Sequence, residues 1–221
     1  MGFVVAIDGP AGSGKGTITK AVSELENLVS IDTGAMYRCV ALDCLNKNIG
    51  PDDLEGIEKV LENIDIQLKN ENGSLVVLLN GKDVSRDIRT PRVDANVAKY
   101  AAVKIIRDKM TPLQRKMAET QDIIMEGRDI TTVVFPDADV KIYLDCSLPE
   151  RARRRYLQNV EKGIECTYEE VLESMIERNT LETERDIAPL LKCDDAVLVD
   201  STNMTIEEVV NRVREIIREK R

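Results

Sequence analysis

The sequence predicts an α/β fold, in which a five-stranded parallel sheet core carries helices on both faces and is interrupted by a small inserted β unit. Three observations predict it. Short apolar runs alternate with helical patterns, which is the order of parallel strands with right-handed crossovers. This order is interrupted from Pro51, where a short helical pattern is followed by a run at residues 64–68 that alternates with period two. The length of 221 residues fits one α/β domain with embellishments.

The first strand and the first two helices follow the expected order. An apolar run at residues 3–8 predicts a strand, and a helix follows it after a glycine-rich connection. A second strand is predicted at residues 28–31 and a second helix at residues 35–45. Either Asp32 or Thr33 can cap that helix, because both side chains accept a hydrogen bond from a free backbone N–H group.

The inserted unit begins with a short predicted helix at residues 52–62. Two β runs follow, at residues 64–68 and 75–79, and the pair Asn72-Gly73 between them is typical of a hairpin turn. A second turn is predicted at residues 80–83. Two helices complete the insertion, broadly at residues 92–99 and 102–120.

The sheet resumes after the insertion. The three remaining strands are predicted near residues 122–126, 139–145 and 196–200. Helices are predicted at residues 149–161, 168–180 and 205–218, with Gly163 ending the first and Thr205 capping the last. Residues 181–189 are predicted to form a charged connection without regular structure.

Composition narrows the classes of function. The net charge of −9 disfavours non-specific nucleic-acid binding, and an acidic protein must concentrate positive charge locally to bind a polyanion. The absence of histidine excludes Ser-His and Cys-His catalysis. Five scattered cysteines without a C-x-x-C pair are typical of reduced thiols in a cytosolic protein. Because no signal peptide or membrane-length apolar run is found, we expect a cytoplasmic protein without membrane association.

A glycine loop between the first strand and the first helix carries the strongest functional signal. Residues 9–17 read GPAGSGKGT, so glycines and Lys15 stand between an apolar strand and a helix. Such a loop turns its backbone N–H groups inward and cradles phosphates, which predicts a P-loop NTPase fold. The usual Ser or Thr directly after the lysine is Gly16 here, and Thr17 comes one residue later. The G-K-G-T ending resembles the loop of nucleoside monophosphate kinases.

Further candidates lie where predicted strands end, because ligands of open parallel sheets bind at the carboxyl edge. Thr33 begins the second helix, and Arg38 follows about one turn later, so both can face an anion. Glu126, Arg128 and Asp129 follow the third strand. We expect Glu126 to orient Mg²⁺-bound water and Arg128 to point into the same cleft.

Arginines near the predicted lid supply positive charge. Arg178 and Arg185 flank a charged, loop-like segment, which is the expected form of a lid that closes over phosphates and excludes water. The run of arginines at positions 151 and 153–155 is usually a solvated face, although one member can stack on a base or contact phosphate. Phosphoryl transfer needs only such positioning and charge stabilisation, so the lack of histidine is no obstacle.

These residues together resemble the bacterial-type cytidylate kinase family over essentially the whole chain. The most specific matches are the loop at residues 8–17, the segment DTGAMYR at residues 32–38 and the segment GRDITTVVFPDA at residues 127–138. Residues 80–90 look like the inserted β subdomain of that family. Residues 188–190 and 195–201 look like its lid exit and last strand.

The resemblance implies transfer of the ATP γ-phosphate to CMP or dCMP in pyrimidine metabolism, with Mg²⁺. It implies one domain over residues 1–221, with the core at 1–50, 100–160 and 190–221, an acceptor-binding insert at about 51–99 and a lid at about 161–189. ATP would contact Gly9, Pro10, Ala11, Gly12, Ser13, Gly14, Lys15, Gly16, Thr17 and Arg154. CMP would contact Thr33, Arg38, Arg107, Arg128, Asp129, Glu182 and Arg185. The catalytic set would be Lys15, Arg128, Arg178 and Arg185, with Thr17 and Glu126 as candidate Mg²⁺ contacts through water. The family also favours a monomer.

The chain departs from the family pattern at several positions. Glu126 stands where family members usually carry Asp, Thr131 where they carry Gly, and Ala98 where a serine helps to recognise the base. Asn179 and Glu182 replace the two lid aspartates. Two alternatives therefore stay open: a kinase of another monophosphate, such as UMP or dTMP, and a nucleotide-binding regulator that has lost catalysis. A GTPase lacks support, because the sequence has no Asn-Lys-x-Asp motif for guanine.

Overall fold

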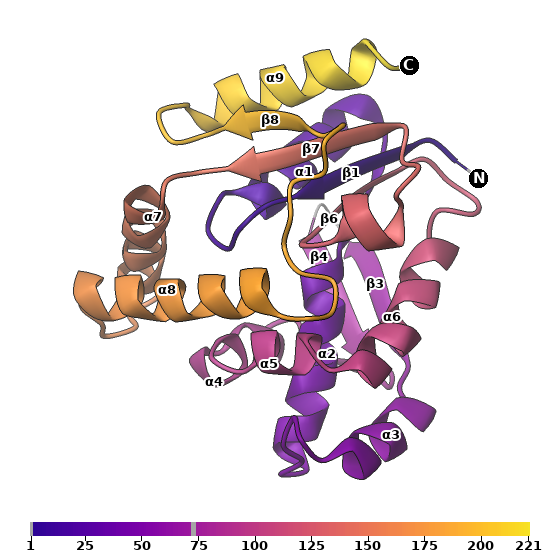
Figure 1. The fold of residues 1–221 in the computed structure, drawn as a ribbon, viewed down its shortest axis with the longest axis vertical. Coiled ribbons are helices and arrows are strands. Elements are labelled where there is room, and N and C mark those ends of the chain that lie inside the picture. Colours follow the sequence, from indigo (N-terminus) through magenta and orange to yellow (C-terminus); the bar gives the residue numbers. More distant parts are fainter. Residues whose placement is uncertain (1, 72–73) are drawn as a thin grey trace. The chain divides into compact units, whose positions relative to one another are not determined.

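The computed structural model describes residues 2–71 and 74–221 and divides into two compact units (Figure 1). Unit 1 comprises Met1–Ile31 and Met117–Arg221, and unit 2 comprises Asp32–Lys116. The chain therefore leaves unit 1 after its second strand begins and returns to it before the third.

A five-stranded sheet organises unit 1, as the sequence predicts. Its strand order is β2-β6-β1-β7-β8, and β1 pairs in parallel with both β6 and β7. The strands are β1 (Val4–Asp8), β2 (Val29–Asp32), β6 (Ile123–Gly127), β7 (Val140–Asp145) and β8 (Val197–Asp200). Every residue of β1 is buried, as expected of a central parallel strand with both faces covered. The carboxyl end of β1 is therefore the edge where the glycine loop begins.

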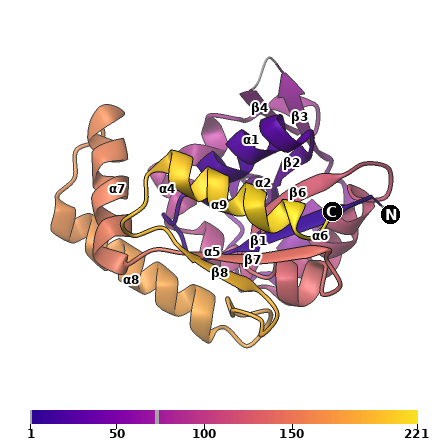
Figure 2. The same cartoon turned by 90° about the horizontal axis from the view of Figure 1, so that it is seen from above.

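The helices of unit 1 flank this sheet. They are α1 (Lys15–Glu26), α7 (Leu148–Glu161), α8 (Tyr168–Glu184) and α9 (Ile206–Arg218). Figure 2 shows α9 beside α1, and apolar side chains of both helices share one core with β1, β7 and β8. Helix α8 packs against α7 through Ala152, Val171 and Met175. This packing fixes α8 within unit 1.

Unit 2 combines helices with a small antiparallel sheet. Its strands are β3 (Ile66–Glu71), β4 (Ser74–Leu79) and β5 (Lys82–Asp83), in that spatial order. Asn80 and Gly81 both have positive φ, 50° and 79°, which is the conformation of a type I′ hairpin turn. The predicted turn at Asn72-Gly73 lies outside the described residues. The helices of unit 2 are α2 (Thr33–Asn46), α3 (Leu54–Glu62), α4 (Pro91–Asp94), α5 (Val97–Ala101) and α6 (Lys104–Lys116), with a 3₁₀ turn at Asp87–Arg89.

The helix predicted at residues 92–99 is instead two short helices, α4 and α5. The break falls at Asn96, whose side-chain amide donates to the carbonyl oxygen of Arg92 at 2.9 Å. That carbonyl is the one that the backbone N–H of Asn96 would bind in a continuous helix, so the side chain competes with the helix. The helix predicted at residues 102–120 is also shorter, ending at Lys116.

The prediction of a connection without regular structure at residues 181–189 is wrong for residues 181–184. Helix α8 continues to Glu184, so the segment that flanks Arg178 is helical rather than loop-like. A capping box between Thr167 and Glu170 starts the helix, and an Arg178–Glu182 ion pair one turn apart supports its last turns. Arg178 and Glu182 therefore lie on the same face of α8.

Helix α9 depends on its cap, and a substitution at Thr205 tests this. Thr205 Oγ1 accepts from the Glu208 N–H at 3.2 Å, and the Thr205 N–H donates to Glu208 Oε2 at 2.7 Å. We expect Thr205→Ala to lower the free energy of unfolding by about 1 kcal/mol, measured by urea denaturation. Thr205→Ser keeps the hydroxyl, so its free energy of unfolding should fall much less. Equal denaturation midpoints for wild type and Thr205→Ala would contradict the assignment.

Candidate active site

The glycine loop links β1 to α1 and is tightly enclosed. A Cβ atom at Gly9 would lie 2.1 Å from the Leu144 carbonyl oxygen, so no larger residue fits there. Gly12 has φ of +80°, and a Cβ atom there would lie 2.8 Å from the Met175 methyl carbon of α8. Both glycines are needed for this approach of loop, strand and helix.

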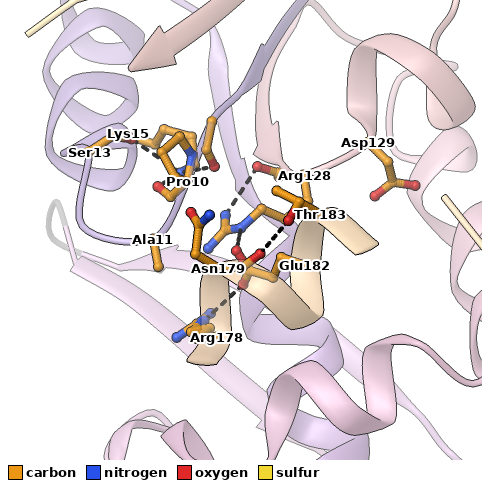
Figure 3. Close-up of polar contacts among 12 residues, drawn as sticks. Pro10, Ala11, Ser13, Lys15, Arg128, Asp129, Arg178, Asn179, Glu182 and Thr183 are labelled. Atoms are coloured by element: carbon orange, nitrogen blue, oxygen red, sulfur yellow. Dashed lines mark hydrogen bonds and ion pairs between the residues drawn. The ribbon is translucent and has the colours of Figure 1, made fainter. Parts of the chain in front are cut away.

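Lys15 is the first residue of α1 and is buried within the loop. Its ammonium group donates to the carbonyl oxygens of Gly9 at 2.7 Å and Pro10 at 2.8 Å, and to Ser13 Oγ at 3.4 Å (Figure 3). Burial and the nearby Arg128 guanidinium lower the pKa of Lys15 to about 7 from an ordinary value of 10.5. The loop therefore holds a positive charge at some cost in desolvation.

Asp8 fixes the turn that follows β6. Its buried carboxylate accepts hydrogen bonds from the Ile130 N–H at 2.9 Å, the Thr131 N–H at 2.8 Å and the Thr131 hydroxyl at 2.6 Å. Burial raises the pKa of Asp8, and these hydrogen bonds oppose the rise. Residues Ile130–Val134 form a single π-helical turn that the sequence analysis did not predict. Thr131, a departure from the family pattern, thus contributes a hydroxyl to this junction.

Glu126 is buried at the end of β6, close to the start of α1. Its Oε1 lies 3.4 Å from Thr19 Oγ1 and 3.1 Å from the position that a Cβ atom would take at Gly16. Thr17, the other residue predicted near Mg²⁺, is exposed on α1. A glycine at position 16 therefore leaves room for the Glu126 carboxylate beside the loop.

Glu182 joins two of the predicted catalytic arginines. Its Oε2 accepts from Arg128 Nε at 2.6 Å and its Oε1 from Arg178 Nε at 2.8 Å (Figure 3). Burial alone would raise the pKa of Glu182, but the two guanidinium groups outweigh it and hold the pKa below its usual range. All three residues were predicted for the site, and the structure brings them together.

Arg185 and Asp129 lie near one another in unit 1. Their side chains are both buried, and Arg185 Nη2 lies 3.9 Å from Asp129 Oδ1. Arg185 Nε also donates to the Ala188 carbonyl oxygen at 2.8 Å. Figure 3 shows Asp129 set apart from the group formed by Arg128, Arg178 and Glu182.

Arg151 is a buried contact of the loop, although the sequence pattern placed it in a run of arginines that is usually a solvated face. It donates to the carbonyl oxygens of Cys146 at 2.9 Å and Ala11 at 3.1 Å, and to Asn179 Oδ1 at 3.4 Å. Its spacing could have indicated burial, because position 151 lies three residues after the apolar Leu148 and therefore on the same face of the helix. Arg154, predicted beside adenine, donates to Glu150 and to the Ser201 carbonyl oxygen at 2.8 Å.

Three predicted acceptor residues belong to unit 2. Thr33 is buried at the first position of α2, where Asp32 caps the helix by accepting from the Ala35 N–H at 3.0 Å. Arg38 donates to the Ile88 carbonyl oxygen at 3.1 Å and pairs with Asp94. Buried Arg107 stacks over the Tyr37 ring, with 5.4 Å from its central carbon to the ring centroid. Ala98 is buried on α5.

Comparison with known proteins establishes the family. The family model described as Cytidylate kinase matches residues 5–219. The cytidylate kinase of Fusobacterium nucleatum is 49% identical over 209 residues, covering 95% of this chain and 94% of the relative. That of Thermosipho melanesiensis is 45% identical and covers 98% of this chain and 97% of the relative. The chain belongs to the cytidylate kinase family.

Solved structures of distant sequence support the fold alone. A crystal structure of a protein from Thermus thermophilus has a TM-score of 0.50 at 16% identity, covering 99% of this chain and 97% of that one. An uncharacterised protein from Eubacterium ventriosum has a TM-score of 0.53 at 11% identity, covering 99% of each chain. Within residues 2–71 and 74–221, every helix is too short or too polar to cross a membrane.

The burial of Lys15 predicts a pH dependence of stability. Between pH 7 and 10.5 the unfolded chain binds the Lys15 proton more strongly than the folded chain, so this group makes stability rise with pH. In Lys15→Met that contribution is gone. We expect the difference in free energy of unfolding, wild type minus variant, to increase across this range, measured by urea denaturation at several pH values.

A control variant separates this effect from the loss of any lysine. Lys20 is exposed on the same helix, so Lys20→Met removes one charge from α1 without touching the loop. A difference between wild type and Lys15→Met that stays constant from pH 7 to 10 would contradict the buried charge.

Proposed function

We propose that this protein transfers the γ-phosphoryl group of ATP to CMP or dCMP, giving ADP and CDP or dCDP. The observation that carries the proposal is the grouping of Lys15, Arg128 and Arg178 at the carboxyl edge of the unit 1 sheet, in a member of the cytidylate kinase family. Such positive charge is what phosphoryl transfer needs, since charge spreads over the transferred group.

Residues of this chain have distinct roles in the proposal. The N–H groups of the glycine loop and Lys15 hold the donor phosphates. Arg128, Arg178 and Arg185 stabilise the charge on the phosphoryl group as it moves. The acceptor is a phosphate that is already ionised at pH 7, so no strong general base is required. This agrees with the lack of histidine in the chain.

Mg²⁺ belongs to the proposal, with Glu126 and Thr17 as its contacts through water. Glu126 fits, because Mg²⁺ prefers oxygen ligands and keeps several waters while it binds one or two carboxylates and the phosphates. When bound, the ion neutralises charge on the donor phosphates. Among the described residues, no group of three or more acidic or cysteine side chains could hold a metal alone. Phosphate oxygens would therefore complete its coordination.

Of the residues that the resemblance implies for the acceptor, Thr33, Arg38 and Arg107 belong to unit 2, and Arg128, Asp129 and Arg185 belong to unit 1. The N-terminus of α2 and the Thr33 hydroxyl favour an anion. An arginine and an aspartate can select cytosine, which offers acceptors at O2 and N3 and a donor at N4. Uracil presents a donor at N3 and an acceptor at O4, and a buried group left unpaired rejects it.

An acceptor series tests the proposed function. We expect kcat/KM with ATP to be at least about tenfold higher for CMP and dCMP than for UMP and dTMP, measured by coupled ADP release. Lys15→Met should abolish turnover, so this variant gives the background rate of ADP release in the assay. Equal or higher values for UMP or dTMP would favour the other monophosphate kinases. Wild type that binds ATP and CMP without turnover would favour a regulator.

Arg185 is expected to act mainly in the transition state. Removing a preorganised donor of this kind costs about 10²–10³ in rate. We therefore expect Arg185→Ala to lower kcat by that order and to change nucleotide KM values much less. Arg153→Ala removes an exposed arginine that pairs with Glu150, and serves as the control. A loss confined to KM would contradict this role.

A further inference from the structure

The side chain of Glu182 is buried and binds two arginine side chains. It lies on α8, one turn after Arg178, and the residue is 4% exposed. Each carboxylate oxygen accepts from a different guanidinium, Oε2 from Arg128 and Oε1 from Arg178. One carboxylate thereby connects the end of β6 with α8 (Figure 3).

The contacts with Glu182 use only the Nε–H of each guanidinium. Both arginines bind Glu182 through Nε, and Arg128 Nη1 donates to the Gly127 carbonyl oxygen at 3.1 Å. Within the described part of the chain, no other acceptor binds Arg178, whose side chain is 24% exposed. An arginine fixed at Nε keeps its Nη groups in a defined plane, which is the fork that binds phosphate oxygens.

Charge balance requires an anion at this place. Lys15 is buried and Arg128 is half-buried, and the two positive charges repel one another, which is one reason why the pKa of Lys15 is low. Glu182 is attractive to both, and it raises the pKa of Arg128 against the effect of burial. Without the carboxylate, Arg128 and Arg178 would each lose the acceptor of Nε–H, and the remaining positive charges would separate.

We propose that Glu182 is a positioning residue, which orients Arg128 and Arg178 for the transferred phosphoryl group and does not recognise the ribose. This rests on the proposed function and replaces the contact with CMP that the resemblance implies for Glu182. The side chain is buried, and both of its oxygens face guanidinium groups. The residue acts on the reaction through the two arginines.

Comparison of CMP with dCMP tests this role, because the two acceptors differ only at the ribose 2′ position. Glu182→Gln preserves the shape, but its amide nitrogen donates and cannot accept from a guanidinium. We expect kcat to fall about 10–100-fold, with CMP and dCMP losing the same factor and ATP KM changing less than threefold. Glu184→Gln, at an exposed position of the same helix, is the matched control and should keep wild-type kinetics.

Two results would overturn the inference. A larger loss for CMP than for dCMP would show that Glu182 recognises the ribose hydroxyl. An unchanged kcat in a folded variant would show that the bridge is dispensable. A double variant, Glu182→Gln with Arg178→Lys, adds a readout that a merely structural role would not move: its loss of kcat should be smaller than the product of the two single losses.

A variant that fails to fold must be distinguished from one that folds but has lost activity. Thermal unfolding is measured for each variant, and if Glu182→Gln does not fold, Glu182→Asp replaces it. The aspartate keeps the charge on a shorter stem and should bind one arginine, with an intermediate loss that is equal for CMP and dCMP. If wild type prefers another monophosphate, the proposed function fails. The same variants are then compared on that acceptor and its ribo or deoxy counterpart, which still tests Glu182.

Discussion

The concentration of positive charge beside a central strand is the constraint on which the unit 1 site depends. The protein has a net charge of −9, yet the positive charges of buried Lys15 and half-buried Arg128 act on one another. Like charges in a medium of low dielectric constant repel strongly, and each also loses hydration. Glu182, Glu126 and Asp8 offset this repulsion, since each raises the pKa of Lys15. The acidic groups of the site are therefore needed to keep its cations in place.

The glycine loop is held by its surroundings as much as by its own sequence. Arg151 donates to the Ala11 carbonyl oxygen, and Ser201 Oγ donates to the Ser13 carbonyl oxygen at 3.2 Å. These contacts come from α7 and from the residue after β8, which lie far from the loop in sequence. Preorganised N–H groups bind phosphate well only if the loop does not have to rearrange, and side chains from distant segments supply that rigidity.

Sequence patterns predicted what depends on local order, and missed what depends on distant partners. The five strands and the cap at Thr205 follow from apolar runs and from a Thr before a helical pattern. The continuation of α8 past residue 180 was missed, because a run of charged residues resembles a loop until Glu182 is paired with two arginines. The π-helical turn after Asp129 depends on hydrogen bonds to Asp8, more than 120 residues earlier. No local pattern shows such a partner.

The departures from the family pattern argue for a working site. Thr131 provides a hydroxyl that donates to Asp8, which a glycine could not do. Asn179 accepts from Arg151, the arginine that holds the glycine loop. Glu182 reaches two guanidinium groups on different elements. Each of these three side chains makes a polar contact with a charged group, whereas loss of function relaxes such contacts. A chain that had become only a regulator would have little reason to keep three of them around one loop.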